Sequence, residues 1–185
     1  SVSNSGIIAL TNGNYVVGSY YWNAYRGAVT WGNGNTGIVG AVSAANSIVG
    51  NISGDYIGNG GITALTNGNY VIRSSSWAVN LGAVTWGSGT GATTGVVSAA
   101  NSLVGTNAND YIGGSGVTAL TNGNYVVNSY QWNGYRGAVT WGNGSTGIVG
   151  AVTAANSLVG SNPNDYIGIN GVTALTNGNY VVGSY

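Results

Sequence analysis

The feature that most constrains the fold is an internal repeat of 55 residues. The phrase Ala-Leu-Thr-Asn-Gly-Asn-Tyr-Val occurs four times, with its leucine at Leu10, Leu65, Leu120 and Leu175. Three full periods and a 20-residue remainder account for all 185 residues. A period of this length is typical of a tandem array in which each repeat is one small structural unit. The spacing predicts units over residues 1–55, 56–110 and 111–165, followed by residues 166–185 as the first hairpin of a fourth.

Within one unit the sequence favours short strands. In the third unit, residues 117–120 and 125–129 flank Asn122-Gly123, a pair that favours a tight β-hairpin because both residues tolerate positive φ. Further β-prone segments cover residues 138–141, 148–153 and 157–160, the last of which either extends the fourth strand or forms a short fifth. Helical periodicity and helix-capping patterns are lacking. We therefore expect an all-β chain.

The number of strands per unit suggests an architecture. Four short antiparallel strands with an aromatic signature are typical of a β-propeller blade. Closed propellers generally need about 4–8 blades, whereas this chain holds three units and part of a fourth. We expect tandem four-stranded antiparallel blades in a propeller-like repeat array, with an open β-solenoid as the alternative.

Composition argues against several functional classes. Charged residues make up 3% of the chain, against roughly 25% in a typical soluble domain, and the net charge is zero. Such a chain has no field to attract nucleic acid. It also has no run of about 18 apolar residues for a membrane-inserted helix. With no Cys, His or Lys, its serines and threonines have no usual base to activate them, so we do not expect an enzyme.

The carboxylates are the first candidate site. They number three in all and recur once per unit, at Asp55, Asp110 and Asp165. Calcium prefers several hard oxygen ligands, commonly including two or more carboxylates, so these are weak metal candidates. The simpler interpretation is that each carboxylate bonds backbone N–H groups in a turn. We expect no cofactor.

The aromatic residues are better candidates for binding and for the core. The segment before the third strand is rich in tyrosine and varies between units, so we assign binding or interface roles there to Tyr20, Tyr21, Tyr25, Tyr130 and Tyr135. Tyrosines beside Asn and Gln suit sugars as well as protein contacts. The tryptophans recur at fixed positions in every unit, which a shared core requires. We therefore assign a structural role between neighbouring sheets to Trp22, Trp31, Trp77, Trp86, Trp132 and Trp141.

The repeat resembles known families. Residues 119–127 (Ala-Leu-Thr-Asn-Gly-Asn-Tyr-Val-Val), 137–142 (Gly-Ala-Val-Thr-Trp-Gly) and 156–160 resemble the tandem repeats of large secreted bacterial proteins of the filamentous-haemagglutinin-like kind. More distantly, Val-Val-Gly-Ser at 181–184 and Gly-Ala-Val at 27–29 are similar to the FG-GAP blade of integrin-type propellers. The first resemblance implies an exported surface protein and the second implies only a fold. FG-GAP blades usually hold calcium in a hairpin loop, but residues 66–69 contain no carboxylate.

These observations lead to a functional expectation. Soluble sheets normally protect their edges with Lys, other charges or Pro, which are nearly absent here. Zero net charge also removes the repulsion that keeps molecules apart. We expect an extracellular or cell-surface structural or adhesive protein that self-associates into a filament or array. The alternative is a carbohydrate-binding, lectin-like module that uses the tyrosine and tryptophan loops.

Overall fold

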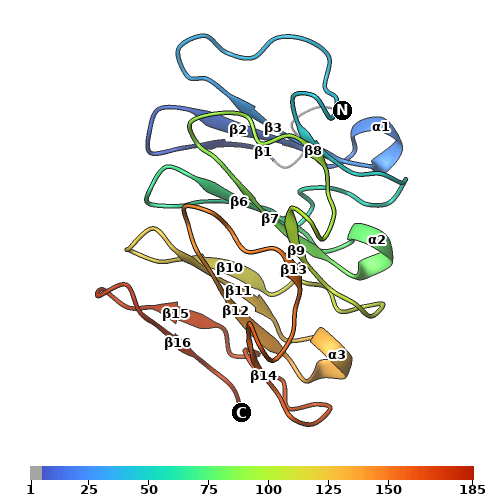
Figure 1. Ribbon diagram of the computed structural model, residues 1–185, viewed down its shortest axis with the longest axis vertical. Helices are drawn as coiled ribbons and strands as arrows, with labels where there is room; N and C mark the ends of the chain where they lie inside the picture. The colour runs from blue at the N-terminus through green and yellow to red at the C-terminus, as the bar shows by residue number, and fades with distance from the viewer. Residues whose placement is uncertain (1–5) are drawn as a thin grey trace.

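The computed structural model describes residues 6–185 and is a stack of small β-sheets along the longest axis of the molecule (Figure 1). The first unit contains β1 (Gly6–Ala9), β2 (Tyr15–Ser19), α1 (Trp22–Tyr25), β3 (Ala28–Gly32) and β4 (Ile48–Val49). The second contains β5 (Gly61–Ala64), β6 (Tyr70–Ser74), α2 (Trp77–Asn80), β7 (Ala83–Gly87), β8 (Gly95–Val96) and β9 (Ser102–Val104). The third contains β10 (Gly116–Ala119), β11 (Tyr125–Ser129), α3 (Trp132–Tyr135), β12 (Ala138–Gly142), β13 (Gly150–Ala151) and β14 (Leu158–Val159). The remainder forms the hairpin β15 (Val172–Ala174) and β16 (Tyr180–Val182).

Each unit begins with an antiparallel hairpin closed by the Thr-Asn-Gly-Asn turn. In the first unit the Leu10 N–H donates to Asn14 O at 2.8 Å, and Gly13 adopts a φ of 87°. This left-handed conformation is readily available to glycine. The third strand of each unit then pairs with the second strand. In the second unit this pairing places Tyr70 opposite Gly87. A side chain at Gly87 would collide with the Tyr70 ring, which explains the glycine after the repeated tryptophan.

The first two sheets each receive one strand from the following unit. The first sheet has the order β1-β2-β3-β4-β8, and the second has the order β13-β9-β7-β6-β5. The outermost strand of each is therefore a short, parallel segment of the following unit. Gly95 N donates to Ser47 O at 3.0 Å and Val97 N donates to Val49 O at 3.1 Å. A unit thus completes the sheet before it, so the strand expected within residues 148–153 pairs with the second unit and not with its own.

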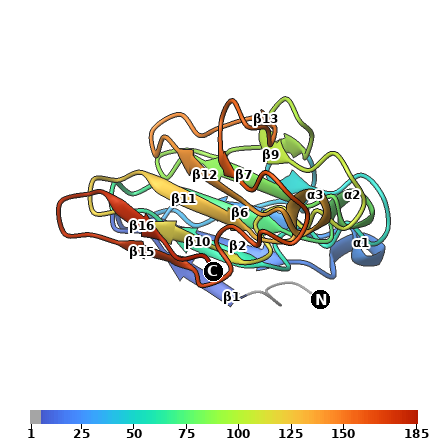
Figure 2. The ribbon, with the colours of Figure 1, turned by 90° about the horizontal axis from the view of Figure 1, so that it is seen from below.

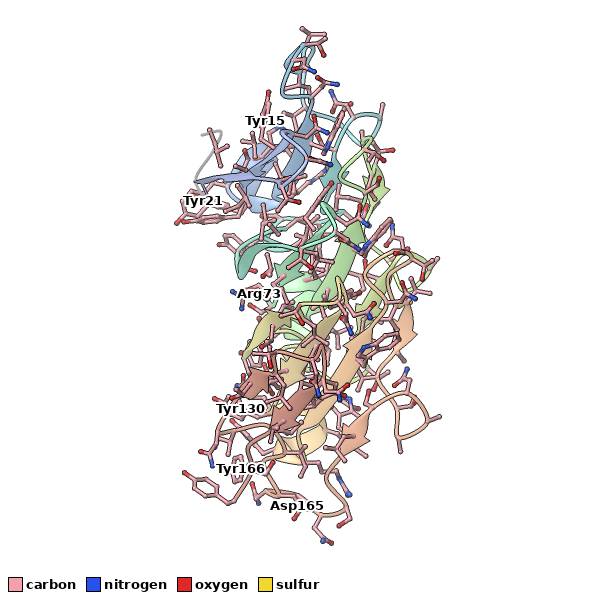
Figure 3. All side chains as sticks on the ribbon, turned by 90° about the vertical axis from the view of Figure 1, so that its left-hand side faces the viewer. Tyr15, Tyr21, Arg73, Tyr130, Asp165 and Tyr166 are labelled. Atoms are coloured by element: carbon pink, nitrogen blue, oxygen red, sulfur yellow. The ribbon has the colours of Figure 1, made fainter. Side chains whose placement is uncertain are left out.

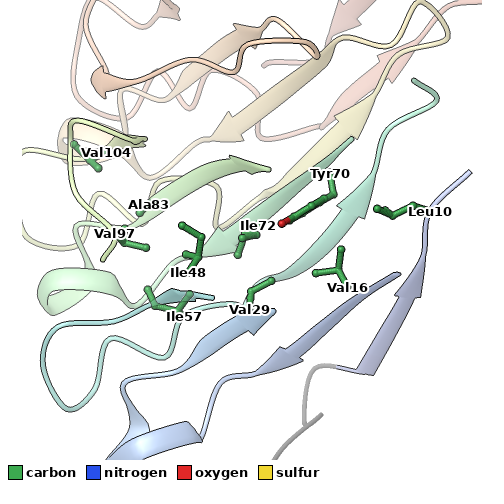
Figure 4. Close-up of a cluster of buried hydrophobic side chains, with 10 residues drawn as sticks. All are labelled: Leu10, Val16, Val29, Ile48, Ile57, Tyr70, Ile72, Ala83, Val97 and Val104. Carbon is green, nitrogen blue, oxygen red and sulfur yellow. The ribbon is translucent and has the colours of Figure 1, made fainter. Parts of the chain in front are cut away.

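The core lies between sheets. Because side chains alternate across a strand, each inner sheet has two apolar faces, one for each neighbour. Val16, Val29 and Ile48 of the first unit meet Tyr70 and Ile72 of the second in one buried cluster (Figure 4). Equivalent positions form the second cluster between the second and third units, and a smaller one covers β15 and β16. Stacking of like units is thus the source of the hydrophobic core.

The prediction of an all-β chain built from tandem, mainly antiparallel sheets is confirmed. Over residues 6–185 the sheets form an open stack and do not close into a ring. This arrangement corresponds to the open alternative and not to a closed propeller. Viewed along the stack, the hairpin turns project on one side and α1, α2 and α3 lie on the other (Figure 2). Those three elements are single turns of four residues. Among the described residues, no helix has the length and apolar character to cross a membrane.

Candidate functional site

The aspartates connect consecutive units. Asp55 Oδ2 accepts the backbone N–H groups of Asn51 (2.8 Å) and Ile52 (3.0 Å) within its own turn. Its Oδ1 accepts the N–H of Ala78, in the α2 turn of the next unit, at 3.0 Å. Asp110 is held in the same way, and both carboxylates are buried. Hydrogen bonds from N–H groups to a carboxylate are stronger than neutral ones, so each aspartate fastens one unit to the next.

Asp165 occupies the same place in the third unit but is more accessible to solvent. Its Oδ2 accepts the Asn162 N–H at 2.8 Å, and this bond is the main reason that the pKa of Asp165 is lowered. The hydrogen bonds of its side chain, among residues 6–185, go to Ser161 and Asn162 in its own turn. The aspartates belong to separate units, and within residues 6–185 no cluster of three or more His, Cys, Asp or Glu side chains could hold a metal.

Asp55 and Asp110 are each bonded to an unusual turn of the following unit. In α2, Ala78, Val79 and Asn80 have φ values of 48°, 59° and 66°, which is one turn of left-handed helix. The equivalent residues of α1 and α3 share this conformation. For residues other than glycine it costs roughly 1–2 kcal/mol each. The turn carbonyls are used: Tyr25 O accepts the Tyr56 N–H at 3.0 Å, which ties the turn to the aspartate loop of its own unit.

The asparagines of the hairpin turns also link units. Asn12 Nδ2 and Asn14 Nδ2 both donate to Gly89 O at 2.8 Å, and Trp31 Nε1 donates to the same oxygen at 3.1 Å. The second unit repeats the arrangement on the third, where the donors to Gly144 O are Asn67, Asn69 and Trp86. These side chains present amide and indole N–H donors to a carbonyl oxygen. The hairpin turns are therefore joined to the following unit by a series of hydrogen bonds, which we call the hairpin ladder.

Three of the tyrosines predicted to form an interface, Tyr20, Tyr21 and Tyr25, gather at α1 of the first unit. The rings of Tyr20 and Tyr21 lie 4.2 Å apart, and those of Tyr21 and Tyr25 lie 5.6 Å apart with planes at 89°. Tyr56, from the aspartate loop, completes the group at 5.6 Å from Tyr25 and 6.3 Å from Tyr21. Tyr21, Ala24, Tyr25 and Tyr56 line a depression of about 700 Å³, which we call the tyrosine cleft. The hydrogen bond with Tyr21 is the main reason that the pKa of Tyr20 is raised.

The other units present different residues on the same backbone. In the third unit, Tyr135 faces Tyr166 with ring centroids 5.5 Å apart, and Tyr130 is partly buried beside Ser115. In the second unit Asn80 replaces the tyrosine and donates to Asn109 Oδ1 at 3.2 Å. Tyr21, Tyr130 and Tyr166 lie along the same side of the stack (Figure 3).

Tyr56 and its equivalents are the residues that the sequence reasoning missed. They follow the aspartate in every unit, so their recurrence pointed to the scaffold. In the structure, Tyr56, Tyr111 and Tyr166 have φ values of 47°, 45° and 50°. Such values are rare for aromatic residues. No local pattern in the sequence indicates this conformation, so no sequence signal could have identified these residues.

The tryptophans occupy two kinds of environment. Trp31 and Trp77 pack against the cluster between the first two sheets, while Trp86 and Trp132 belong to the next cluster. Trp22 is only partly buried and Trp141 is 42% exposed, and neither belongs to a core cluster of the described residues. Both lie at ends of the stack, where a neighbouring sheet is missing or incomplete. Trp22 and Trp141 therefore lie outside the core clusters, whereas the other four tryptophans pack in them or against them.

Two further observations concern ionisation in the core. Burial raises the pKa of Tyr70 and of Tyr125 to about 12. Burial also lowers the pKa of Arg73, whose guanidinium donates to Gly113 O at 3.3 Å, across the boundary between the second and third units. A cation that bonds a backbone carbonyl serves to join units in the same way as the aspartates.

The chain belongs to a family defined by a repeat of unknown function (DUF5650). The family model matches residues 9–59, 64–114, 119–169 and 174–185, so its matches recur at the same 55-residue interval as the structural units. Comparison with curated proteins finds no match. Membership establishes a tandem repeat protein, while the family's description assigns no activity.

Proposed function

We propose that this chain is a structural or adhesive repeat protein of the cell surface or extracellular space, which builds a filament or array by stacking repeats end to end. The observation that supports the proposal is that one interface is used again and again, always in the same direction. One face of each sheet packs against the opposite face of the next. A head-to-tail contact of this kind has no built-in limit on length.

The two ends of the stack present the halves of this same interface. Val181 points away from the core and corresponds to Val16, Val71 and Val126, which are fully buried by a following sheet. At the opposite end, Ile7 corresponds to Ile62 and Val117, which pack against a preceding sheet. Val181 is 53% exposed and Ile7 is 64% exposed. Burying such a side chain contributes about 1.5–3 kcal/mol, so each end favours another unit.

The surface of the molecule supports assembly over a freely dissolved state. The chain carries three arginines and three aspartates, and two of the aspartates are buried in bonds between units. Little charge remains to oppose contact between copies. The resemblance to repeats of large secreted proteins of the filamentous-haemagglutinin-like kind supports the location at the cell surface. In this function the chain supplies a scaffold and performs no catalysis.

The experiment compares the size of particles formed by matched variants. Val181→Lys and Ile7→Lys each place a charge in one end face, whereas Val79→Lys places it on the exposed α2 turn, away from both ends. We expect the unmodified chain and Val79→Lys to form linear, concentration-dependent assemblies in light scattering and electron microscopy. We expect both end-face variants to form smaller particles than the unmodified chain. A monodisperse 18.4 kDa particle at high concentration for the unmodified chain would overturn the proposal.

A further inference from the structure

The tyrosine cleft has features that the stacking of repeats does not require. Tyr21 and Tyr25 are 42% and 51% exposed, so much of their ring surface contributes nothing to a core. Tyr21, Ala24 and Tyr25 of the lining come from α1 and the residue before it, and α1 lies on the side of the stack opposite the hairpin turns (Figure 2). We propose that the tyrosine cleft of the first unit binds a neutral carbohydrate.

The first argument is the conformational cost of the cleft. Tyr25 has a φ of 67° and Tyr56 a φ of 47°, both in the left-handed region. Asn80 stands in the second unit where Tyr25 stands in the first, with a φ of 66°. Asparagine tolerates this conformation better because its short polar side chain bonds locally. Placing a tyrosine there is unfavourable for folding, and strained residues of this kind cluster at binding sites.

The second argument is that the backbone is constant while its side chains vary. All three units keep the left-handed turn and the tyrosine that follows the aspartate. The two other ring positions read Tyr21 and Tyr25 in the first unit, Ser76 and Asn80 in the second, and Gln131 and Tyr135 in the third. A rigid framework with variable exposed residues is the usual arrangement of a binding surface.

The third argument is chemical. The residues that line the cleft are three tyrosines and Ala24, none of them charged at neutral pH. The nearby carboxylate of Asp55 is buried and bonded to backbone N–H groups, so it does not face a ligand. Tyrosine offers an apolar ring face together with a hydroxyl that donates and accepts. A pyranose ring is the complement, with apolar C–H faces and hydroxyl groups around its edge.

The size of the cleft favours the same ligand class. Its volume of about 700 Å³ falls within the range of small-molecule sites, about 300–1,000 Å³. Aromatic rings also attract quaternary ammonium groups, but one such group would fill only a small part of this space. A segment of oligosaccharide is long enough to contact all three rings, whose centroids lie 5.6–6.3 Å apart.

The test exchanges residues between units of the same chain. Tyr21→Ser with Tyr25→Asn gives the first unit the residues that the second unit already carries on the same backbone, so the fold is expected to persist. Binding is first surveyed on an array of neutral oligosaccharides, and the strongest binder is then titrated by calorimetry. We expect the double variant to lose about tenfold or more in affinity, with an unchanged melting temperature or a higher one.

The reverse exchange tests for gain of binding. Ser76→Tyr with Asn80→Tyr builds the three-ring group around Tyr111 in the second unit, and we expect the number of bound oligosaccharides per chain to rise by one. Tyr185→Ser removes a highly exposed tyrosine elsewhere and should leave binding unchanged. The proposal is overturned if the unmodified chain binds no neutral oligosaccharide, including the case where it binds only a choline or peptide probe. It is also overturned if the Tyr21/Tyr25 variant binds with unaltered affinity.

Discussion

Asp55 and Asp110 illustrate how single residues connect the units of this array. A carboxylate out of water normally needs a cation or a full set of hydrogen bonds. Here the donors are backbone N–H groups, supplied by the aspartate's own turn and by the left-handed turn of the following unit. The carboxylate therefore stabilises both the turn and the junction between units.

Replacing Asp110 with Asn should destabilise the chain by about 1–3 kcal/mol. The substitution swaps one oxygen of the buried Asp110 side chain for an NH₂ group, which leaves the N–H of Thr106, Asn107 or Asn133 facing a donor in place of an acceptor. Urea unfolding followed by circular dichroism measures the change in free energy. Asp165→Asn is the matched control, because Asp165 is less buried and bonds no following turn. Equal losses in the two variants would contradict the role in joining units.

Tyr70 and Tyr125 predict how stability responds to alkaline pH. Burial raises both pKa values to about 12, whereas an unfolded tyrosine ionises near pH 10. Below pH 10 both states keep the proton and stability is unaffected. Between about pH 10 and pH 12 only the unfolded chain loses it, so the free energy of unfolding should fall by roughly 1.4 kcal/mol per pH unit for each tyrosine.

The measurement is urea unfolding at a series of pH values from 9 to 12. In a Tyr70→Phe/Tyr125→Phe variant the slope of stability against pH should be much shallower, whatever its stability at neutral pH. Val139→Ala serves as the control, because it lowers stability from a cluster that contains neither Tyr70 nor Tyr125 and removes no titratable group, so the slope should stay unchanged. A double variant that keeps the full slope would show that other groups govern alkaline unfolding.

At this scale the sequence predicted some contacts and missed others. One isolated aspartate per unit, after Gly or Asn, pointed to a turn, and the Oδ2 bonds of Asp55 are of that kind. Its Oδ1 bond to Ala78 spans 23 residues and two units, and no local pattern encodes it. Tyr56 was missed because a residue present in every unit is indistinguishable, by recurrence alone, from a core residue.

Among the structural elements, the left-handed turns α1, α2 and α3 could not be predicted from the sequence. Three consecutive residues with positive φ, including the β-branched Val79, oppose the local preferences of the chain. All three turns are bonded by the loop of their own unit, and α2 and α3 are also bonded by the aspartate of the preceding unit. The short strand β13 poses the same difficulty, since its two residues pair with another unit. Hairpins such as β10–β11 were predictable because turn and pairing are both local.

Val79→Gly should stabilise the chain by about 1 kcal/mol. Glycine removes the clash of Cβ in the left-handed conformation, and this gain exceeds its greater entropy when unfolded. The third unit already has Gly134 at the equivalent position, with a φ of 69°. Val149→Gly is the control: Val149 is also exposed but lies outside the positive-φ residues, so there the substitution should destabilise. Thermal unfolding gives both changes, and destabilisation by Val79→Gly would show that the turn is not strained.

At the scale of the whole molecule, stability depends on contacts between neighbours. The described units each give a strand to the sheet before them or receive one from the unit after, and the large clusters lie between sheets. The 55-residue period predicted the units and their stacking. The choice between a ring and an open stack depends on the rotation between sheets, and a repeat phrase carries no information about that angle. In such arrays, stability is approximately the sum of unit and interface terms.

Removing residues 56–110 tests this view directly. Asp55 would then precede Tyr111, and its Oδ1 would meet the N–H of Asn133 as Asp110 does now. All positions facing across the new junction are equivalents of those removed, so we expect a folded chain with cooperative urea unfolding. The dependence of its free energy on urea should be smaller by about a third, because that slope follows the surface exposed on unfolding.

A second deletion, of residues 56–82, removes about half a period and is the control for length. It places the β7 strand where the hairpin β5–β6 belongs, so the aspartate, the hairpin ladder and the apolar faces all lose their partners together. We expect no cooperative transition from this shorter cut, although it removes fewer residues. If both deletions unfold alike, the period would not determine the fold. If only the 55-residue deletion folds, the interface between successive units is interchangeable, which is the property that an extendable array requires.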